Sequence, residues 1–219
     1  MTVLPRLHVV TNDEVLADHA FGTRAFAVVE AGGDAIALHV RGRAAAAARV
    51  YEIAAGLRPA CTRLGARLFV NDRVDVALAC SADGVQLGVR SMPVADARTL
   101  VGAQCMIGYS AHAADEGVSA AGAGADFLML GSVWETTSHP GTEPAGVATL
   151  RATVEHAGAP VIAIGGVTPA RVADAAGAGA HGVAVLSGIW SAPEVGEAVE
   201  TYLVALRAAY AGERGKEKA

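Results

Sequence analysis

The stretch AAGAGADFLMLGS at residues 120–132 occurs again, with few changes, as AAGAGAHGVAVLS at residues 175–187. Each copy has the pattern of a helix end capped by glycine, then a turn, then a short apolar strand. Weaker copies are AGGDAIALHV at 31–40 and SADGVQLGV at 81–89. The copies recur at roughly 50-residue spacing or multiples of it, which predicts that helices and strands alternate along the chain.

Continuous apolar runs mark the strands, and runs of this kind are typical of parallel strands that are covered on both faces. Eight strands are predicted, at residues 7–11, 35–40, 67–70, 84–87, 105–110, 126–131, 160–165 and 182–186. Amphipathic helices are predicted between them, among them 44–65 and 195–210. The pattern predicts a single-domain (β/α)8 TIM barrel over residues 1–211, followed by a charged, flexible tail at 212–219. An open doubly wound sheet is the alternative.

Composition excludes several classes of protein. The net charge is −5, so a nucleic acid is not an expected partner. The longest uncharged run, residues 175–193, contains four glycines and does not resemble a membrane span. Lysine occurs only at Lys216 and Lys218, which excludes an aldolase that forms a Schiff base inside its fold. Three cysteines without a C-x-x-C pair, and an N-terminus unlike a signal peptide, favour a cytoplasmic protein.

Polar residues that directly follow the strands are the candidates for the functional site, because a barrel of this kind has its site at the C-terminal ends of its strands. Those predicted to bind substrate include His39, Arg41, Arg43, Asn71, Asp72 and Ser110. For His39 and Asp72 a structural role, such as capping the following helix, is an equal alternative. His8 and His181 lie at strand starts, and we expect them to be structural.

The seventh and eighth units predict a phosphate site. IGGVTPARV (164–172) and VLSGIWSAPEV (185–195) each end a strand and begin a helix with small residues. Thr168 is the expected N-cap of its helix, with Pro169 at the first helical position. Free backbone N–H groups at such a junction attract an anion. The predicted phosphate-binding residues are Gly165, Gly166, Ser187 and Gly188. The alternative is that the glycines only turn the chain.

An ordered set of motifs resembles the thiamine phosphate synthase and TenI superfamily. The motifs are LHVVTND (7–13), LHVRGR (38–43), FVNDRVDVAL (69–78), ADGVQLGVRSMPVADAR (82–98), IGYSAH (107–112), GADFLMLGSVWETTSHPG (124–141), VIAIGGVTPARV (161–172) and GAHGVAVLSGIW (179–190). The resemblance implies a (β/α)8 barrel that binds phosphorylated thiamine precursors. It includes two activities: a Mg²⁺-dependent synthase that joins a pyrimidine pyrophosphate to a thiazole phosphate, and a TenI-type tautomerase that aromatises a carboxythiazole phosphate.

Four positions depart from the synthase motifs that the resemblance implies. His39 and Arg43 stand at the Gln and Lys of Q-L-R-x-K, Ser91 stands at the metal-binding Asp of G-Q-x-D, and His139 stands at the Lys of T-x-T-K. These changes favour a tautomerase, an isomerase that needs neither metal nor cofactor. The synthase, with Mg²⁺, is one alternative, and a non-catalytic regulator that binds a thiamine precursor is another.

The loop GSVWETTSHPG (131–141) is the predicted catalytic loop of such a tautomerase. Ser132 stands where the tautomerase motif has its acid/base histidine, so His139 is expected to carry the proton. Glu135 orients His139 or acts as the base. Thr136 and Ser138 are expected to bond the phosphate or ring of a phosphorylated thiazole, while Arg41 or Arg43 holds its carboxylate. The alternative is that SHPG is only a turn. Members of the superfamily often associate, so the resemblance also implies a homo-oligomer as a partner.

Overall fold

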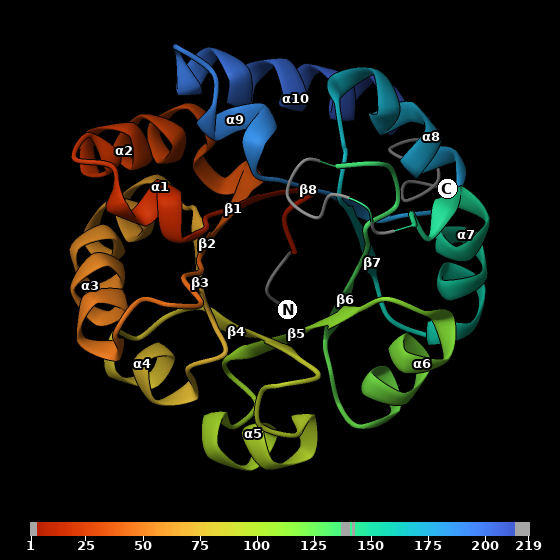
Figure 1. Ribbon diagram of the computed structural model, residues 1–219, viewed down its shortest axis with the longest axis horizontal. Coiled ribbons are helices and arrows are strands. Elements are labelled where there is room, and N and C mark those ends of the chain that lie inside the picture. Colours follow the sequence, from red (N-terminus) through yellow and green to blue (C-terminus); the bar gives the residue numbers. More distant parts are fainter. Residues whose placement is uncertain (1–3, 137–140, 142, 213–219) are drawn as a thin grey trace.

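The computed structural model describes residues 4–136, 141 and 143–212, which form one closed barrel of parallel strands (Figure 1). The strands are β1 (Leu7–Val10), β2 (Ile36–Val40), β3 (Arg67–Asn71), β4 (Gly84–Gly88), β5 (Met106–Ala111), β6 (Phe127–Leu130), β7 (Val161–Ile164) and β8 (Gly182–Val185). Leu7 pairs with both Ile36 of β2 and Val183 of β8, which closes the sheet. All eight predicted strands are confirmed to within two residues at each end, and the open sheet is excluded.

A ring of helices surrounds the strands in Figure 1. The helices and 3₁₀ turns are α1 (Asp13–Ala17), α2 (Phe21–Gly32), η1 (Gly33–Ala35), α3 (Ala47–Leu64), α4 (Val74–Ala79), α5 (Val94–Val101), α6 (Ala114–Gly122), α7 (Gly146–Ala157), η2 (Pro169–Arg171), α8 (Val172–Gly177), α9 (Ser187–Trp190) and α10 (Val195–Ala209). The predicted helices 44–65 and 195–210 correspond to α3 and α10. Of the tail predicted at 212–219, only Gly212 lies within the described residues. Among the described helices, none is long and apolar enough to cross a membrane.

The internal repeat corresponds to the connections α6–β6 and α8–β8. Gly124 and Gly179 occupy equivalent turns and have φ angles of 103° and 87°. Backbone at these angles favours glycine, because a side chain there would be strained. The repeated AAGAGA is therefore the sequence of a helix end that turns directly into a strand.

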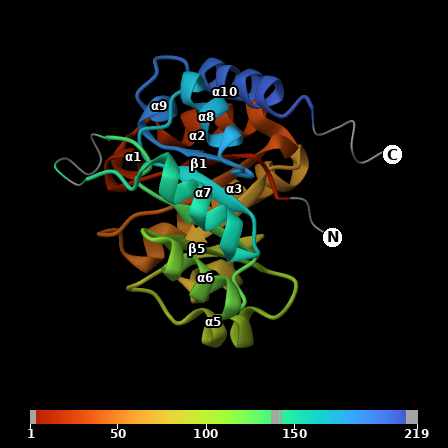
Figure 2. The ribbon, with the colours of Figure 1, turned by 90° about the vertical axis from the view of Figure 1, so that its right-hand side faces the viewer.

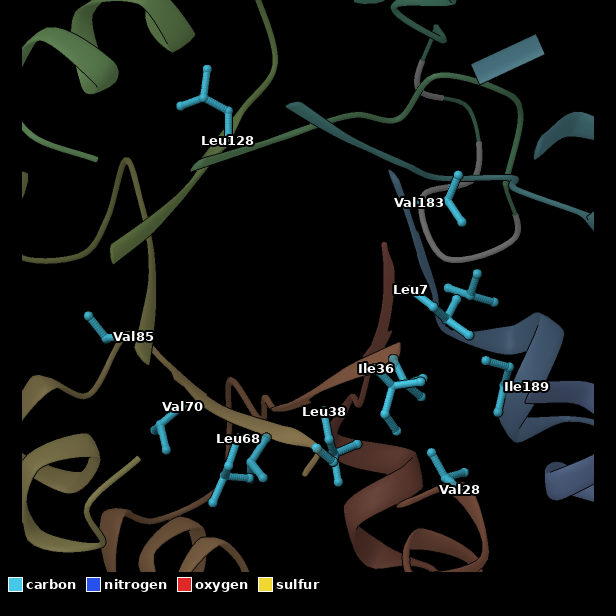
Figure 3. Close-up of a cluster of buried hydrophobic side chains, with 14 of the residues drawn as sticks. Leu7, Val28, Ile36, Leu38, Leu68, Val70, Val85, Leu128, Val183 and Ile189 are labelled. Carbon is cyan, nitrogen blue, oxygen red and sulfur yellow. The ribbon is translucent and has the colours of Figure 1, made fainter. Parts of the chain in front are cut away.

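Two apolar layers hold the barrel together. The larger lies between strands and helices, and Figure 3 shows Leu38 and Leu68 of the strands together with Val28 and Ile189 of the helices in this layer. The smaller fills the barrel and includes Phe69 and Phe127. The sequence is only 5% aromatic, so most of the core is aliphatic. Apolar burial of this kind is the main stabilising contribution to folding.

The loops that follow the strands lie together at one end of the barrel. In Figure 2 the short helices α1 and α9, which follow β1 and β8, lie at the same end. These loops carry the polar residues predicted as the functional site. The fold therefore brings residues that are far apart in sequence to one face.

Candidate functional site

A cavity of about 1130 Å³ opens at the C-terminal ends of the strands. Most of the predicted site residues line it: Arg41, Arg43, Asn71, Asp72, Ser110, Ser132, Thr136, Gly165, Gly166, Ser187 and Gly188. They come from the loops or ends of β2, β3, β5, β6, β7 and β8. Its volume is at the upper end of what small-molecule sites have, so the cavity has room for more than one small substrate.

The arginine loop after β2 is held by two residues of the first unit. The buried Thr11 hydroxyl accepts the Arg41 N–H at 2.8 Å and lies 3.0 Å from the Arg41 carbonyl oxygen. The Asp13 carboxylate accepts the backbone N–H groups of Arg43, Ala44 and Ala45 at 2.9 to 3.1 Å. A charged acceptor forms strong bonds to N–H groups. The motif VVTND thus fixes the backbone that carries Arg41 and Arg43.

Positive charge is concentrated along one side of the cavity. Among the described residues, four arginines line it, namely Arg41, Arg43, Arg73 and Arg90. Burial lowers the pKa of Arg41, and the charges of Arg43 and Arg90 lower it further, while Asp72 and Asp13 act in the opposite direction. The guanidinium groups are therefore close enough to repel one another. Such a group is suited to bind a polyanion.

Arg90 is one of the candidate polar residues that follow the predicted strands, but no binding role was predicted for it or for Arg73. Arg90 lies two residues after the end of β4, and this position was the available signal. The departures from the synthase motifs include a lost Lys and a lost Asp, and the motif itself has no arginine at this position. The structure shows that the cavity is richer in positive charge than those two losses suggested.

Asp72 and Ser91 form a hydrogen-bonded pair on the same side. Asp72 has a φ of 65°, and its Oδ1 accepts the Ser91 hydroxyl at 2.5 Å. The Ser91 Oγ in turn accepts the Gly88 N–H at 2.9 Å. Asp72 therefore faces the cavity and does not cap the following helix, whose own first-turn acid, Asp75, pairs with Arg73.

A metal site made by the protein alone is absent from the part of the chain that the structure describes, where no three His, Cys, Asp or Glu residues are grouped. Mg²⁺, however, is commonly held by one or two carboxylates together with substrate phosphates. Asp72, with the hydroxyl of Ser91 beside it, fits that smaller requirement. These two residues could therefore hold Mg²⁺ that is also bound to a phosphorylated ligand.

The predicted phosphate loops form the opposite wall. Gly166 has a φ of 66°, and a Cβ there would lie 2.3 Å from the Glu135 carbonyl oxygen. The Trp134 N–H bonds the Gly165 carbonyl oxygen at 3.1 Å, so the β6 and β7 loops lie against each other. Thr168 is the N-cap of η2 and Pro169 its first residue, as predicted, although the Thr168 side chain makes no capping hydrogen bond.

Two of the predicted residues do not line the cavity. His39 is fully buried inside the barrel, where it bonds His8, so we do not expect it to touch a ligand. The side chain of Glu135 is exposed outside the cavity lining. Ser138 and His139 lie outside the described residues. The proton-transfer roles of Glu135 and His139 therefore receive no support from the structure.

His112, at the end of the motif IGYSAH, also lines the cavity. Its Nδ1 lies 2.6 Å from the Gly131 carbonyl oxygen, so Nδ1 carries a proton and donates it to this oxygen. Its backbone N–H bonds Glu116 at 2.8 Å. The ring is thus fixed beside the first residue of the β6 loop. The sequence placed His112 after a strand but gave no reason to choose it.

Comparisons with known proteins agree with this arrangement. The family model for thiamine monophosphate synthase matches residues 7–189. The thiamine-phosphate synthase of Chloroflexus aurantiacus is 42% identical over 87% of each chain. The bifunctional protein ThiM/ThiE of Symbiobacterium thermophilum is 46% identical over 72% of this chain, which spans 33% of that longer protein. The structure of the Pyrococcus furiosus thiamine phosphate pyrophosphorylase superposes with a TM-score of 0.81, at 34% identity and covering 93% of this chain and 96% of that one.

These relatives contradict the prediction of a tautomerase. The two that are named as the synthase or pyrophosphorylase cover 87% and 93% of this chain. The prediction was wrong because it rested on single substitutions and did not include the arginines that line the same cavity. The isomerase assignment falls with it. The resemblance to the superfamily is confirmed, and this chain belongs to the thiamine monophosphate synthase family.

Proposed function

We propose that this protein is a thiamine-phosphate synthase, a transferase that joins hydroxymethylpyrimidine pyrophosphate to thiazole phosphate. One observation carries the proposal. Arg41, Arg43, Arg90 and Asp72 line one large cavity at the C-terminal ends of the strands, and Arg41 lies close enough to the other three for their charges to affect its pKa. This grouping matches a substrate that carries a pyrophosphate. The names of the family and of its relatives support this reaction.

The reaction breaks the bond between the pyrimidine methylene carbon and the pyrophosphate oxygen. The thiazole nitrogen supplies the electron pair for the new carbon–nitrogen bond, and the pyrophosphate leaves with the electrons of the broken bond. Negative charge therefore grows on the leaving oxygen. Fixed positive groups at that point lower the barrier because they are already oriented before the charge develops. Arg41, whose backbone is held by Thr11, is suited to this role.

The thiazole phosphate is expected at the opposite wall, against Gly165, Gly166, Ser187 and Gly188. In this fold the loops after the seventh and eighth strands commonly bind phosphate. The cavity separates this wall from the arginines, so each substrate has its own anchor. Thr136 and Ser132 lie beside the glycines and can bond the same ligand. The binding roles predicted for Asn71 and Ser110 are retained for the pyrimidine substrate.

Mg²⁺ is the cofactor that the synthase reaction implies, and Asp72 and Ser91 are the residues that would hold it. Bound there with the pyrophosphate, it would neutralise part of the charge of the leaving group. The expectation of no cofactor belonged to the tautomerase. A cytoplasmic location, a homo-oligomer and the absence of a nucleic-acid partner remain predictions.

The test is direct formation of the product. Purified protein is incubated with both substrates and Mg²⁺, and thiamine phosphate is quantified by fluorescence after oxidation to the thiochrome, alongside released pyrophosphate. We expect equal amounts of the two products, dependence on both substrates, and loss of turnover in EDTA. Release of pyrophosphate without thiamine phosphate would show a hydrolase instead. If neither thiamine phosphate nor pyrophosphate forms, the proposal is refuted.

A further inference from the structure

Two histidines bond each other inside the barrel, in the layer below the cavity. His8 of β1 and His39 of β2 have no exposed surface. Nδ1 of His8 lies 2.8 Å from Nε2 of His39, and Nε2 of His8 lies 3.0 Å from the Pro5 carbonyl oxygen. The His39 ring stacks on Phe69, with ring centroids 4.7 Å apart and planes 10° from parallel. The reaction as described above gives this pair no role.

The direction of each hydrogen bond follows from the carbonyl group at one end. A carbonyl oxygen only accepts, so Nε2 of His8 carries its proton. A buried imidazole without a carboxylate partner is neutral and has a single N–H, which leaves Nδ1 of His8 as an acceptor. Nε2 of His39 must then donate to it. The Nδ1 of His39 is left without a proton.

Asn71 is the next polar group in this chain of contacts. It ends β3, lines the cavity and lies close enough to His39 to affect the pKa of that ring. Nonetheless, Nδ1 of His39 and Oδ1 of Asn71 are both buried without a partner. Two acceptors cannot bond each other, whereas the amide nitrogen of Asn71 has two donors. The oxygen and nitrogen of an amide are assigned from its hydrogen bonds, and these bonds require the nitrogen on the His39 side.

We propose that His8 and His39 are positioning residues that fix the Asn71 amide, with Nδ2 donating to His39 Nδ1 and Oδ1 presented to the cavity as an acceptor. The identity of the ligand, the pyrimidine substrate, rests on the proposed function. An acceptor selects an N–H donor, and the amino group of the pyrimidine substrate is one. Pyrophosphate offers acceptors only. The buried pair thus favours recognition of the aminopyrimidine ring and contributes nothing to binding of the pyrophosphate.

The first measurement is the ¹⁵N NMR spectrum of the histidine rings in the wild-type protein. We expect His8 and His39 to be protonated at Nε2 and bare at Nδ1. A proton on Nδ1 of His39 would overturn the proposal. This result needs no variant and no turnover, so it stands even if a substitution prevents folding.

The second measurement is binding of two probes, 4-amino-5-hydroxymethyl-2-methylpyrimidine and inorganic pyrophosphate with Mg²⁺. In His8→Phe the acceptor for His39 is lost, and we expect the aminopyrimidine to bind about tenfold more weakly, the effect of one hydrogen bond. Pyrophosphate affinity should stay within about twofold. His8→Gln keeps an acceptor oxygen and should bind both probes as the wild type does. Phe127→Leu, which changes packing against the His8 ring, is the control for loosening of the interior.

The outcomes separate this inference from the proposed function. Equal weakening of both probes in His8→Phe, no weakening of either, or no aminopyrimidine binding by the wild type would overturn the positioning role. If the wild type forms no thiamine phosphate but shows the expected protonation and probe selectivity, the proposed reaction fails and the positioning of Asn71 stands.

Discussion

The hydroxyl of Ser91 donates a 2.5 Å hydrogen bond to Oδ1 of Asp72 at the edge of the arginine-lined cavity. A hydroxyl in this place leaves Asp72 as the single carboxylate of the pair, while Arg41 and Arg90 lie close by. A cation therefore meets a weak site in the free protein and a stronger one once a pyrophosphate is bound. Binding of Mg²⁺ and of the pyrophosphate substrate should be strongly coupled.

A second carboxylate at this position should strengthen the metal site. In Ser91→Asp we expect the Mg²⁺ concentration for half-maximal activity to fall about tenfold, because affinity of oxygen sites rises with ligand charge. Ser91→Asn has a similar size without the charge and should give no such gain. Pyrophosphate release is measured across a Mg²⁺ titration, and calorimetry measures Mg²⁺ binding without substrate. A lower requirement in Ser91→Asn as well would show that charge is not the cause.

Loss of Arg41 should weaken catalysis more than loss of an arginine elsewhere. Arg41→Met keeps the length of the side chain and removes its charge, and we expect kcat/KM for the pyrimidine pyrophosphate to fall about 10- to 100-fold. The control is Arg151→Met on the exposed side of α7, which should leave kcat/KM unchanged. Steady-state rates at varied salt measure both. Equal effects of the two substitutions would contradict a specific role for Arg41.

The fold was predictable because its strands are buried on both faces. In a chain where helices and strands alternate, a short apolar run such as FLML with glycines on both sides predicts a buried strand. In the structure this run is β6. The position of Arg41 and Asp72 at the cavity followed from the rule that sites lie at strand ends.

The depth of each side chain was not predictable in the same way. His39 lies in β2 and Arg41 directly follows that strand, and residues two apart in extended chain lie on the same side, here the inward one. His39 lies in the buried layer with His8, and Arg41 lies in the layer above, at the cavity. The sequence does not show where the packed interior ends, because this depends on the volumes of Phe69 and Phe127 from other strands. Arg41 and Arg90 come from the loops after β2 and β4, so their proximity also appears only in space.

A side chain at Gly166 should damage both stability and activity. Its Cβ would meet the Glu135 carbonyl oxygen at 2.3 Å, and its φ of 66° disfavours any other residue. We expect Gly166→Ala to lower the free energy of unfolding by about 1 to 3 kcal/mol and to reduce affinity for thiazole phosphate. Gly22→Ala is the control, since a Cβ there meets nothing within 4 Å and α2 should gain up to about 1 kcal/mol. Urea unfolding measures both, and a Gly166→Ala protein of wild-type stability would exclude the close contact.

The buried His8 should make stability depend on pH below neutrality. Burial lowers the pKa of His8 from 6.5 to about 3 in the folded protein, whereas in the unfolded chain the ring keeps its ordinary pKa. Between these values the unfolded chain binds the proton and the folded protein does not. Stability is therefore complete above pH 6.5 and falls as the pH decreases toward 3, with a slope of up to about 1.4 kcal/mol per pH unit. The buried His39 contributes in the same direction.

The His8→Phe protein separates this contribution from acid effects elsewhere. The phenylalanine ring does not titrate, so the variant should lose less stability than the wild type between pH 7 and pH 5, although its stability at pH 7 is lower because the bonds to Pro5 and His39 are lost. Urea unfolding at the two pH values gives the four free energies that are needed. An equal loss in both proteins would mean that the folded protein accepts a proton on His8 as readily as the unfolded chain. That result would also contradict the proposed donor and acceptor assignment along Pro5, His8, His39 and Asn71, because this assignment requires both histidine rings to be neutral.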